Sequence, residues 1–182
     1  MFKKDLRTLG IDDSPFKFSD NQVSIIGALF EGSKNLERVL ETGIEKDGFD
    51  ATEKIIRMVE ETGSKEHLRA VFLDGITFGG FNIADIREIN QKTEIPVIAV
   101  SSKKPSIENV KKSARNLENP EKRIEKIRNA GKLHRKDGER LWYQFSGTEI
   151  QKAEELIEMT RSISKIPEPL RTAHKIASRE II

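Results

Sequence analysis

The sequence predicts an α/β fold in which a mixed five-stranded sheet, a three-strand meander followed by two parallel strands, is flanked by helices. The first fifty residues hold extended, β-rich runs separated by turn signals and show no helical periodicity. After residue 50, helical spacing of apolar residues alternates with short strands that are apolar throughout, which is typical of parallel strands buried on both faces. The length of 182 residues fits a single domain over residues 1–182.

The meander consists of three runs before residue 46. The first expected strand, 6–11, ends at an Asp-Asp-Ser-Pro turn signature over 12–15. The second, 22–30, is rich in β-forming residues and is followed by a turn. The run 36–44 is compatible with a helix and with a strand, but the tight turn before it and the polar residues after it favour a third strand.

Helices and buried strands alternate through the rest of the chain. Asp50 and Glu53 have the spacing of a capping box that begins a helix, and Asn82 is expected to be the N-cap of the next helix. The elements expected after the helix at residue 50 are a strand over 68–73, a helix from 82, a strand over 96–100, helices over 106–117 and 120–130, a strand-like run over 141–145, a helix over 148–161 and a last helix from about 169. This order matches a ribonuclease H-like sheet, in which a meander is followed by two right-handed crossovers.

Composition excludes several classes of function. A formal net charge of +2 excludes a wholly basic nucleic-acid binder, and the absence of cysteine excludes a disulfide scaffold and a thiolate metal site. No apolar run approaches the roughly 18 residues of a membrane span. The N-terminal residues also lack a secretory signal, so we expect a cytoplasmic protein with no membrane partner. Nothing in the sequence indicates an oligomeric state.

Two acidic residues stand at the carboxyl ends of expected strands. Asp12 follows the first strand and Asp74 follows the fourth, and ligands of open α/β sheets bind at such ends. If the two strands are parallel neighbours, their carboxylates face each other and suit Mg²⁺ or Mn²⁺, which would activate water or orient a phosphate. A third carboxylate at Asp47 or Asp50 would complete the set. The alternative is that these acids are turn and cap residues, with Asp50 as a helix N-cap.

A basic segment follows the last expected parallel strand. Residues 103–140 contain 13 cations and 6 anions, a net charge of +7 that leaves −5 for the rest of the chain. A phosphate backbone, of DNA or RNA, is the partner that such a segment suits, with Lys103, Lys104 and His134 as candidate phosphate contacts. The alternative is a solvated helical surface with i,i+4 ion pairs.

The histidines and glycines give no further catalytic motif. No two of the three histidines have metal or triad spacing, so serine-type and zinc-type hydrolase chemistry have no support. His174 lies on the last expected helix beside Leu170, Ala173 and Ala177, where we expect it to pack as a structural residue. The glycine-rich loop over 74–82 matches neither a P-loop nor a Rossmann fingerprint.

Four segments carry a resemblance to a known family: Gly10–Ser14, Leu73–Ile76, Pro96–Val100 and Pro167–His174 are similar in order and spacing to endonuclease V. The closest resemblance is to an uncharacterised, mainly archaeal family that is grouped with endonuclease V, and Phe78–Ile86 and Pro167–His174 are particularly like that family. The resemblance covers nearly the whole chain. It implies a ribonuclease H-like fold, Mg²⁺-dependent cleavage of DNA or RNA near deaminated bases, and metal ligands at the same Asp12 and Asp74.

The sequence departs from endonuclease V at several of that family's functional positions. The glutamate expected before the first helix is replaced by a neighbourhood that offers Asp47 or Asp50, and residues 46–49 stand where the Pro-rich wedge is expected. Lys103 matches the family's lysine only approximately, and the late histidine after Ser-Pro-Gly is missing at 145–148. The sequence therefore predicts a divergent endonuclease V-like protein that acts as a Mg-dependent nuclease or phosphodiesterase. The alternatives are an inactive nucleic-acid-binding module on the same fold and a structural or protein-interaction domain.

Overall fold

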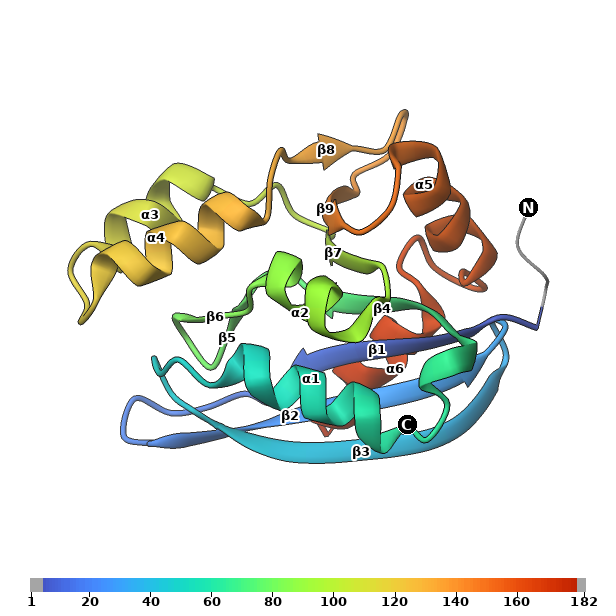
Figure 1. The fold of residues 1–182 in the computed structure, drawn as a ribbon, viewed down its shortest axis with the longest axis horizontal. Coiled ribbons are helices and arrows are strands. Elements are labelled where there is room, and N and C mark those ends of the chain that lie inside the picture. The colour runs from blue at the N-terminus through green and yellow to red at the C-terminus, as the bar shows by residue number, and fades with distance from the viewer. Residues whose placement is uncertain (1–4, 180–182) are drawn as a thin grey trace.

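A seven-stranded mixed sheet forms the centre of the computed structural model, which describes residues 5–179 (Figure 1). Its strands are β1 (Arg7–Asp13), β2 (Gln22–Glu31), β3 (Asn35–Glu45), β4 (Leu68–Asp74), β7 (Val97–Ser101), β8 (His134–Arg135) and β9 (Trp142–Ser146). Their order across the sheet is β3-β2-β1-β4-β7-β9-β8. The first three strands form an antiparallel meander, and β4 and β7 run parallel to β1. These five strands are the predicted sheet, so the fold class is confirmed.

The sheet is larger than predicted because the run around residue 143 joins it. β9 pairs antiparallel with β7, and the short β8 pairs antiparallel with β9 at the edge. The amino-acid pattern of a strand does not identify the strand that pairs with it. The pattern at 141–145 therefore predicted a strand but not its place in the sheet. A separate two-stranded hairpin, β5 (Thr77–Phe78) and β6 (Asn82–Ile83), occupies part of the segment where a helix was expected.

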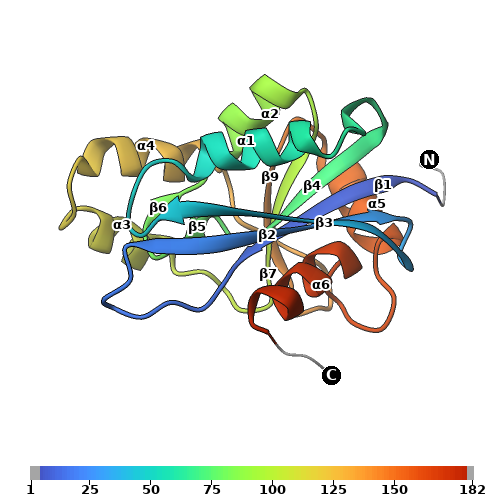
Figure 2. The same cartoon turned by 90° about the horizontal axis from the view of Figure 1, so that it is seen from below.

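Helices cover both faces of the sheet. They are α1 (Ala51–Glu61), α2 (Ile86–Thr93), α3 (Ile107–Ala114), α4 (Pro120–Asn129), α5 (Ile150–Met159) and α6 (Glu168–Ala177). Figure 2 shows α1 and α2 on one face and α6 on the other, and α3 and α4 form a hairpin at one end of the molecule. One hydrophobic cluster lies under α1 and α2, and a second lies between the sheet and α5 and α6. In the described part of the chain, no helix has the length and apolarity that crossing a membrane requires.

Gly10 allows α6 to lie directly against β1. A Cβ atom built on Gly10 would lie 2.2 Å from the carbonyl carbon of Pro169 and 2.3 Å from the amide nitrogen of Leu170. Any side chain at this position would therefore push the helix away from the strand. Leu170 and Ala173 are buried beneath the sheet. The close packing sets the distance between α6 and the end of β1, where Asp12 lies.

The turn before α1 is held by a contact that the sequence pattern did not indicate. Asp50 stands at the N-cap position, but its Oδ1 accepts hydrogen bonds from Glu45 N at 3.1 Å and Asn82 Nδ2 at 2.7 Å. The amide of Ala51 instead donates to Asn82 Oδ1 at 3.0 Å. Asn82 is fully buried, and α2 is capped by Asp85. The predictions of a capping box at Asp50 and of a helix N-cap at Asn82 were wrong, because a tertiary contact supplies the acceptor for α1.

Candidate metal centre

Asp12 and Asp74 lie side by side at the carboxyl ends of two parallel strands. The register of β1 and β4 pairs Ile11 with Leu73, so the next residue of each strand reaches the same edge of the sheet. Buried apolar residues on both faces fix these strands in place. The structure thus brings together the two acids that the sequence singled out for their position after a strand.

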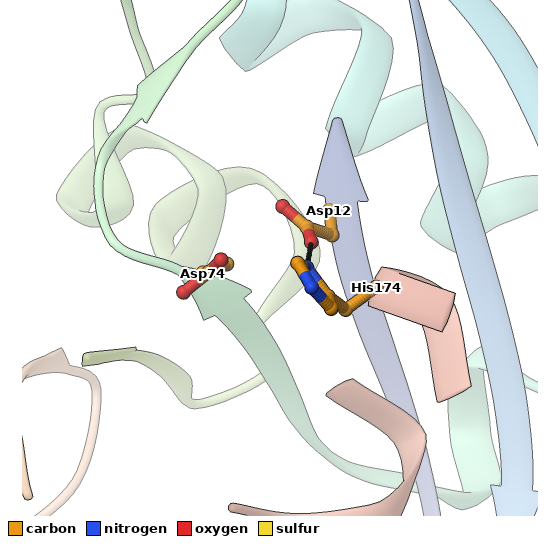
Figure 3. Close-up of side chains that lie close together, drawn as sticks. All are labelled: Asp12, Asp74 and His174. Carbon is orange, nitrogen blue, oxygen red and sulfur yellow. Dashed lines mark hydrogen bonds and ion pairs between the residues drawn. The ribbon is translucent and has the colours of Figure 1, made fainter. Parts of the chain in front are cut away.

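His174 completes the group from the opposite end of the chain. One ligand atom from each of Asp12, Asp74 and His174 lies within 4.8 Å of the others, and Figure 3 shows the three side chains converging. His174 Nδ1 lies 2.6 Å from Asp12 Oδ2, a hydrogen-bond distance at which the pair shares one proton. The imidazole follows Leu170 by four residues on α6, so both project from the same side of the helix toward the sheet.

The expectation that His174 is a structural packing residue was wrong. Its apolar neighbours Leu170 and Ala173 are buried, but the His174 side chain is 56% exposed and faces Asp12. Sequence spacing gave no warning, because the two residues are 162 positions apart. The available signal was the segment 167–174 itself, one of those that resemble the endonuclease V relatives.

Burial and like charge shape the electrostatics of this group. The Asp12 side chain is only 4% exposed, and its Oδ1 accepts a hydrogen bond from Asp13 N at 2.8 Å. Burial and then the negative charge of Asp74 raise the pKa of Asp12 to about 7, although the hydrogen bond to His174 lowers it. Desolvation also raises the pKa of Asp74, and His174 opposes that shift. The two carboxylates repel each other when both are ionised, and a bound cation would balance their negative charge.

The donor atoms fit a divalent cation. Two carboxylates supply hard oxygen ligands of the kind that Mg²⁺ and Mn²⁺ prefer, and the imidazole nitrogen favours Mn²⁺ and later transition metals. Asp13, next in the chain, is not part of the group, since its Oδ2 accepts a hydrogen bond from Gly79 N at 2.7 Å. Burial is the largest cause of the raised pKa of Asp13.

A small pocket of about 140 Å³ adjoins the group. Its lining residues are Asp74, Ser102, Ile166, Leu170, Arg171 and His174. The guanidinium of Arg171 is held by Glu168, which is buried and accepts hydrogen bonds from Arg171 Nε at 3.0 Å and Nη2 at 2.8 Å. This pairing places a permanent positive charge beside the carboxylates, where it suits an anion such as phosphate.

The candidate third carboxylates lie in the turn between β3 and α1. Asp47 Oδ1 accepts a hydrogen bond from Phe81 N at 2.9 Å, and Asp50 Oδ1 accepts those of Glu45 and Asn82. Among the described residues, the group of potential metal ligands is Asp12, Asp74 and His174 and includes neither of them. One carboxylate oxygen of each acid holds the turn.

The candidate phosphate contacts lie at different distances from the group. Lys103 and Lys104 are exposed in the loop after β7, whose Val100 pairs with Asp74, so they lie at the same edge of the sheet as the carboxylates. His134 occupies the same row three strands away, about 14 Å from Asp74 at the usual strand spacing. Its ring stacks on Tyr143 with centroids 5.5 Å apart.

Nearly the whole chain matches one family model. Residues 4–181 match the model described as Endonuclease dU. The chain belongs to the endonuclease dU family. A relative, a UPF0215 protein of Methanothermobacter thermautotrophicus, is 43% identical over 179 residues, which make up 97% of this chain and 88% of the relative. The resemblance to an uncharacterised archaeal family is therefore confirmed.

Solved structures share the fold of this chain. A protein of unknown function from Archaeoglobus fulgidus has 38% sequence identity and a TM-score of 0.88, over 97% of this chain and 98% of that one. Ciona intestinalis endonuclease V, in complex with DNA containing an inosine, has 11% identity and a TM-score of 0.62, over 96% and 85% of the two chains. The second similarity shows a shared ribonuclease H-like fold.

Proposed function

We propose that this protein is a divalent-metal-dependent endonuclease that hydrolyses a phosphodiester bond in DNA or RNA. The observation that carries the proposal is the Asp12–Asp74–His174 group at the carboxyl ends of β1 and β4. The group lies in a family described as endonuclease dU and on the fold of endonuclease V. DNA containing deoxyuridine, which the family description names, is the first substrate to test, and we expect the reaction in the cytoplasm.

Asp12, Asp74 and His174 are the proposed ligands of Mg²⁺ or Mn²⁺. When bound, such an ion supplies a water of lowered pKa and neutralises charge on the phosphate. Asp12 and His174 give up the proton they share, so ligand binding and proton release are coupled. Ile11 and Leu73, both fully buried, keep the two strand ends fixed so that the carboxylates need no rearrangement.

The cations around the group are the proposed phosphate contacts. Arg171 lines the pocket with Asp74 and His174, and its guanidinium is oriented by buried Glu168. Lys103 and Lys104 extend this positive surface along the loop after β7. A nucleic-acid strand that crosses this edge would place a phosphate beside the carboxylates and its neighbours beside the lysines.

Asp74→Asn is the variant that tests the proposal. The wild-type protein should cleave an end-labelled oligonucleotide that contains one deoxyuridine in Mg²⁺ or Mn²⁺ and not in EDTA, and the variant should lose that activity. Asp137→Asn makes the same chemical change at an exposed residue in the turn between β8 and β9, and it should cleave like the wild type. RNA and undamaged DNA are tested beside the first substrate.

Two results would contradict the proposal. Cleavage that persists in Asp74→Asn would show that the carboxylate is not needed. Metal-independent binding of nucleic acid without cleavage of any substrate would instead establish the inactive binding module. Calorimetric titration with Mn²⁺ separates these cases further, because the enzyme requires binding that Asp74→Asn weakens.

A further inference from the structure

We propose that the loop between β1 and β2, residues 14–21, is a nucleic-acid contact in which the ring of Phe18 stacks on an unpaired base. The inference rests on the proposed function in one respect, that the partner is a nucleic acid. It adds to the proposed function a contact residue outside the metal centre. It also adds a property of the substrate, which must contain a base that is not stacked on its neighbours.

The side chain of Phe18 is exposed to solvent on an ordered loop. Its side chain is 98% exposed, the highest value among the large apolar residues described. The loop around it is nevertheless fixed, since Ser14 N donates to Ser24 O at 2.8 Å and Lys17 N donates to Asp20 Oδ2 at 2.6 Å. Full burial of such a ring is worth about 1.5–3 kcal/mol. The folded protein does not gain this free energy, because the ring stays exposed. The ordered loop therefore leaves the ring available to a partner.

A cation in contact with the ring and a second one next to it in the chain indicate which partner it suits. Lys46 Nζ lies 4.8 Å from the centroid of the Phe18 ring and also donates a hydrogen bond to the Phe18 carbonyl oxygen. Lys17 precedes Phe18 in the chain and is exposed. An exposed aromatic ring with cations close by suits a nucleic-acid strand, in which bases alternate with phosphates.

The loop is continuous with the metal centre. It begins directly after Asp13, so the Cα of Phe18 lies at most about 18 Å from that of Asp13, the length of about five nucleotides. Phe16 lines a cavity of about 340 Å³ under the loop, which Ile26 of β2 and Ile176 of α6 also line. Ile26 pairs with Asp12 in the β1–β2 ladder. One strand can therefore reach both Phe18 and the carboxylates.

Binding of a fluorescein-labelled single-stranded 20-mer, followed by anisotropy in EDTA, tests the inference without any cleavage. Phe18→Ala should weaken binding about tenfold, because stacking on one aromatic ring has an effect of this order. Phe18→Trp should restore it. The salt dependence should keep its slope in Phe18→Ala, since no charge is removed, whereas Lys46→Gln should reduce the slope by about one phosphate contact.

Leu36→Ala is the matched control. Leu36 is 42% exposed and is the second residue of β3. It lies at the opposite end of the meander, where Asn35 pairs with Glu31 and Glu31 with Arg7. This variant should bind like the wild type. The inference is overturned if Phe18→Ala binds within twofold of the wild type, if Leu36→Ala loses as much affinity, or if Phe18→Trp does not rescue binding. Because binding is measured without metal, these outcomes are independent of whether Asp74→Asn still cleaves.

Discussion

Two clusters of acids lie beyond the same end of the sheet, and their oxygens have different neighbours. At the metal centre, Asp12 faces Asp74 across two parallel strands, and burial raises the pKa of both. In the turn after β3, Asp47 and Asp50 accept hydrogen bonds from backbone and amide N–H groups. A carboxylate at a strand end is thus a candidate ligand where it faces a second carboxylate and an imidazole, and a structural residue where it accepts the hydrogen bonds that hold a turn.

Arg123 holds the turn in which Asp47 and Asp50 lie. The residue is 2% exposed and donates to the carbonyl oxygens of Glu118, Gly48, Phe81 and Asp47. It also lies over the ring of Phe49, with its guanidinium carbon 4.1 Å from the centroid.

These contacts join α4 to the turn after β3 and to the β5–β6 hairpin. The positive charge of Arg123 is therefore buried in the turn, whereas Lys103 and Lys104 are exposed and Arg171 lines a pocket while paired with Glu168.

The largest expected effect is seen when an acid of each cluster is replaced by alanine. The substitution at the metal centre should lower activity, and the one in the turn should lower stability. Asp74→Ala should reduce metal-dependent cleavage by more than about a hundredfold, the upper effect of losing even an outer-sphere partner of a metal. Its free energy of unfolding in EDTA should stay close to that of the wild type. Asp50→Ala should keep its activity while folded. Its free energy of unfolding should fall by about 2 kcal/mol, because Glu45 N and Asn82 Nδ2 lose their acceptor.

Urea unfolding and a cleavage assay on the same preparations give both quantities. The comparison fails if Asp50→Ala, at a temperature where it is fully folded, loses as much activity as Asp74→Ala. That result would make Asp50 the third carboxylate that the sequence suggested, and it would require the turn to move toward the metal centre.

The next effect concerns the stability that Arg123 gives to the turn. Arg123→Met should lower the free energy of unfolding by about 3 kcal/mol, since it leaves several carbonyl oxygens without donors in a buried place. Arg128→Met is the control on the same helix. Arg128 is exposed, and its loss should change stability by less than about 0.5 kcal/mol. Equal unfolding midpoints for the two variants would show that the network has no net effect.

The predictable parts of this molecule are those that depend on local pattern. Strands and helices followed from the spacing of apolar residues, and Asp12 and Asp74 followed from their place at strand ends. His174 could not be found in this way, because its partner lies 162 positions away and the approach depends on Gly10 packing against α6. The role of Asn82 likewise depends on a contact with Ala51 in another element. Local pattern determines an element, and tertiary packing determines which side chains meet.

The last expected effect is a pH dependence of the stability of the metal-free protein, which arises at the metal centre. The pKa of Asp12 is raised from 3.8 in the unfolded chain to about 7 in the folded protein, so between these values the folded state binds more protons. The contribution of Asp12 to the stability of the fold is therefore fully present below about pH 4 and is lost as the pH rises toward 7 and above. In EDTA, the Tm should fall as the pH rises through this window, because the folded state then loses the protons that it binds in excess of the unfolded chain.

Asp12→Asn isolates this contribution, because asparagine does not titrate. The difference between the Tm of the variant and that of the wild type should grow in favour of the variant as the pH rises from 5 to 8, as followed by circular dichroism. Parallel curves for the two proteins would mean that Asp12 ionises in the fold as easily as in the unfolded chain. The repulsion that defines the metal centre would then be absent, and the distinction between the two acid clusters would lose its electrostatic basis.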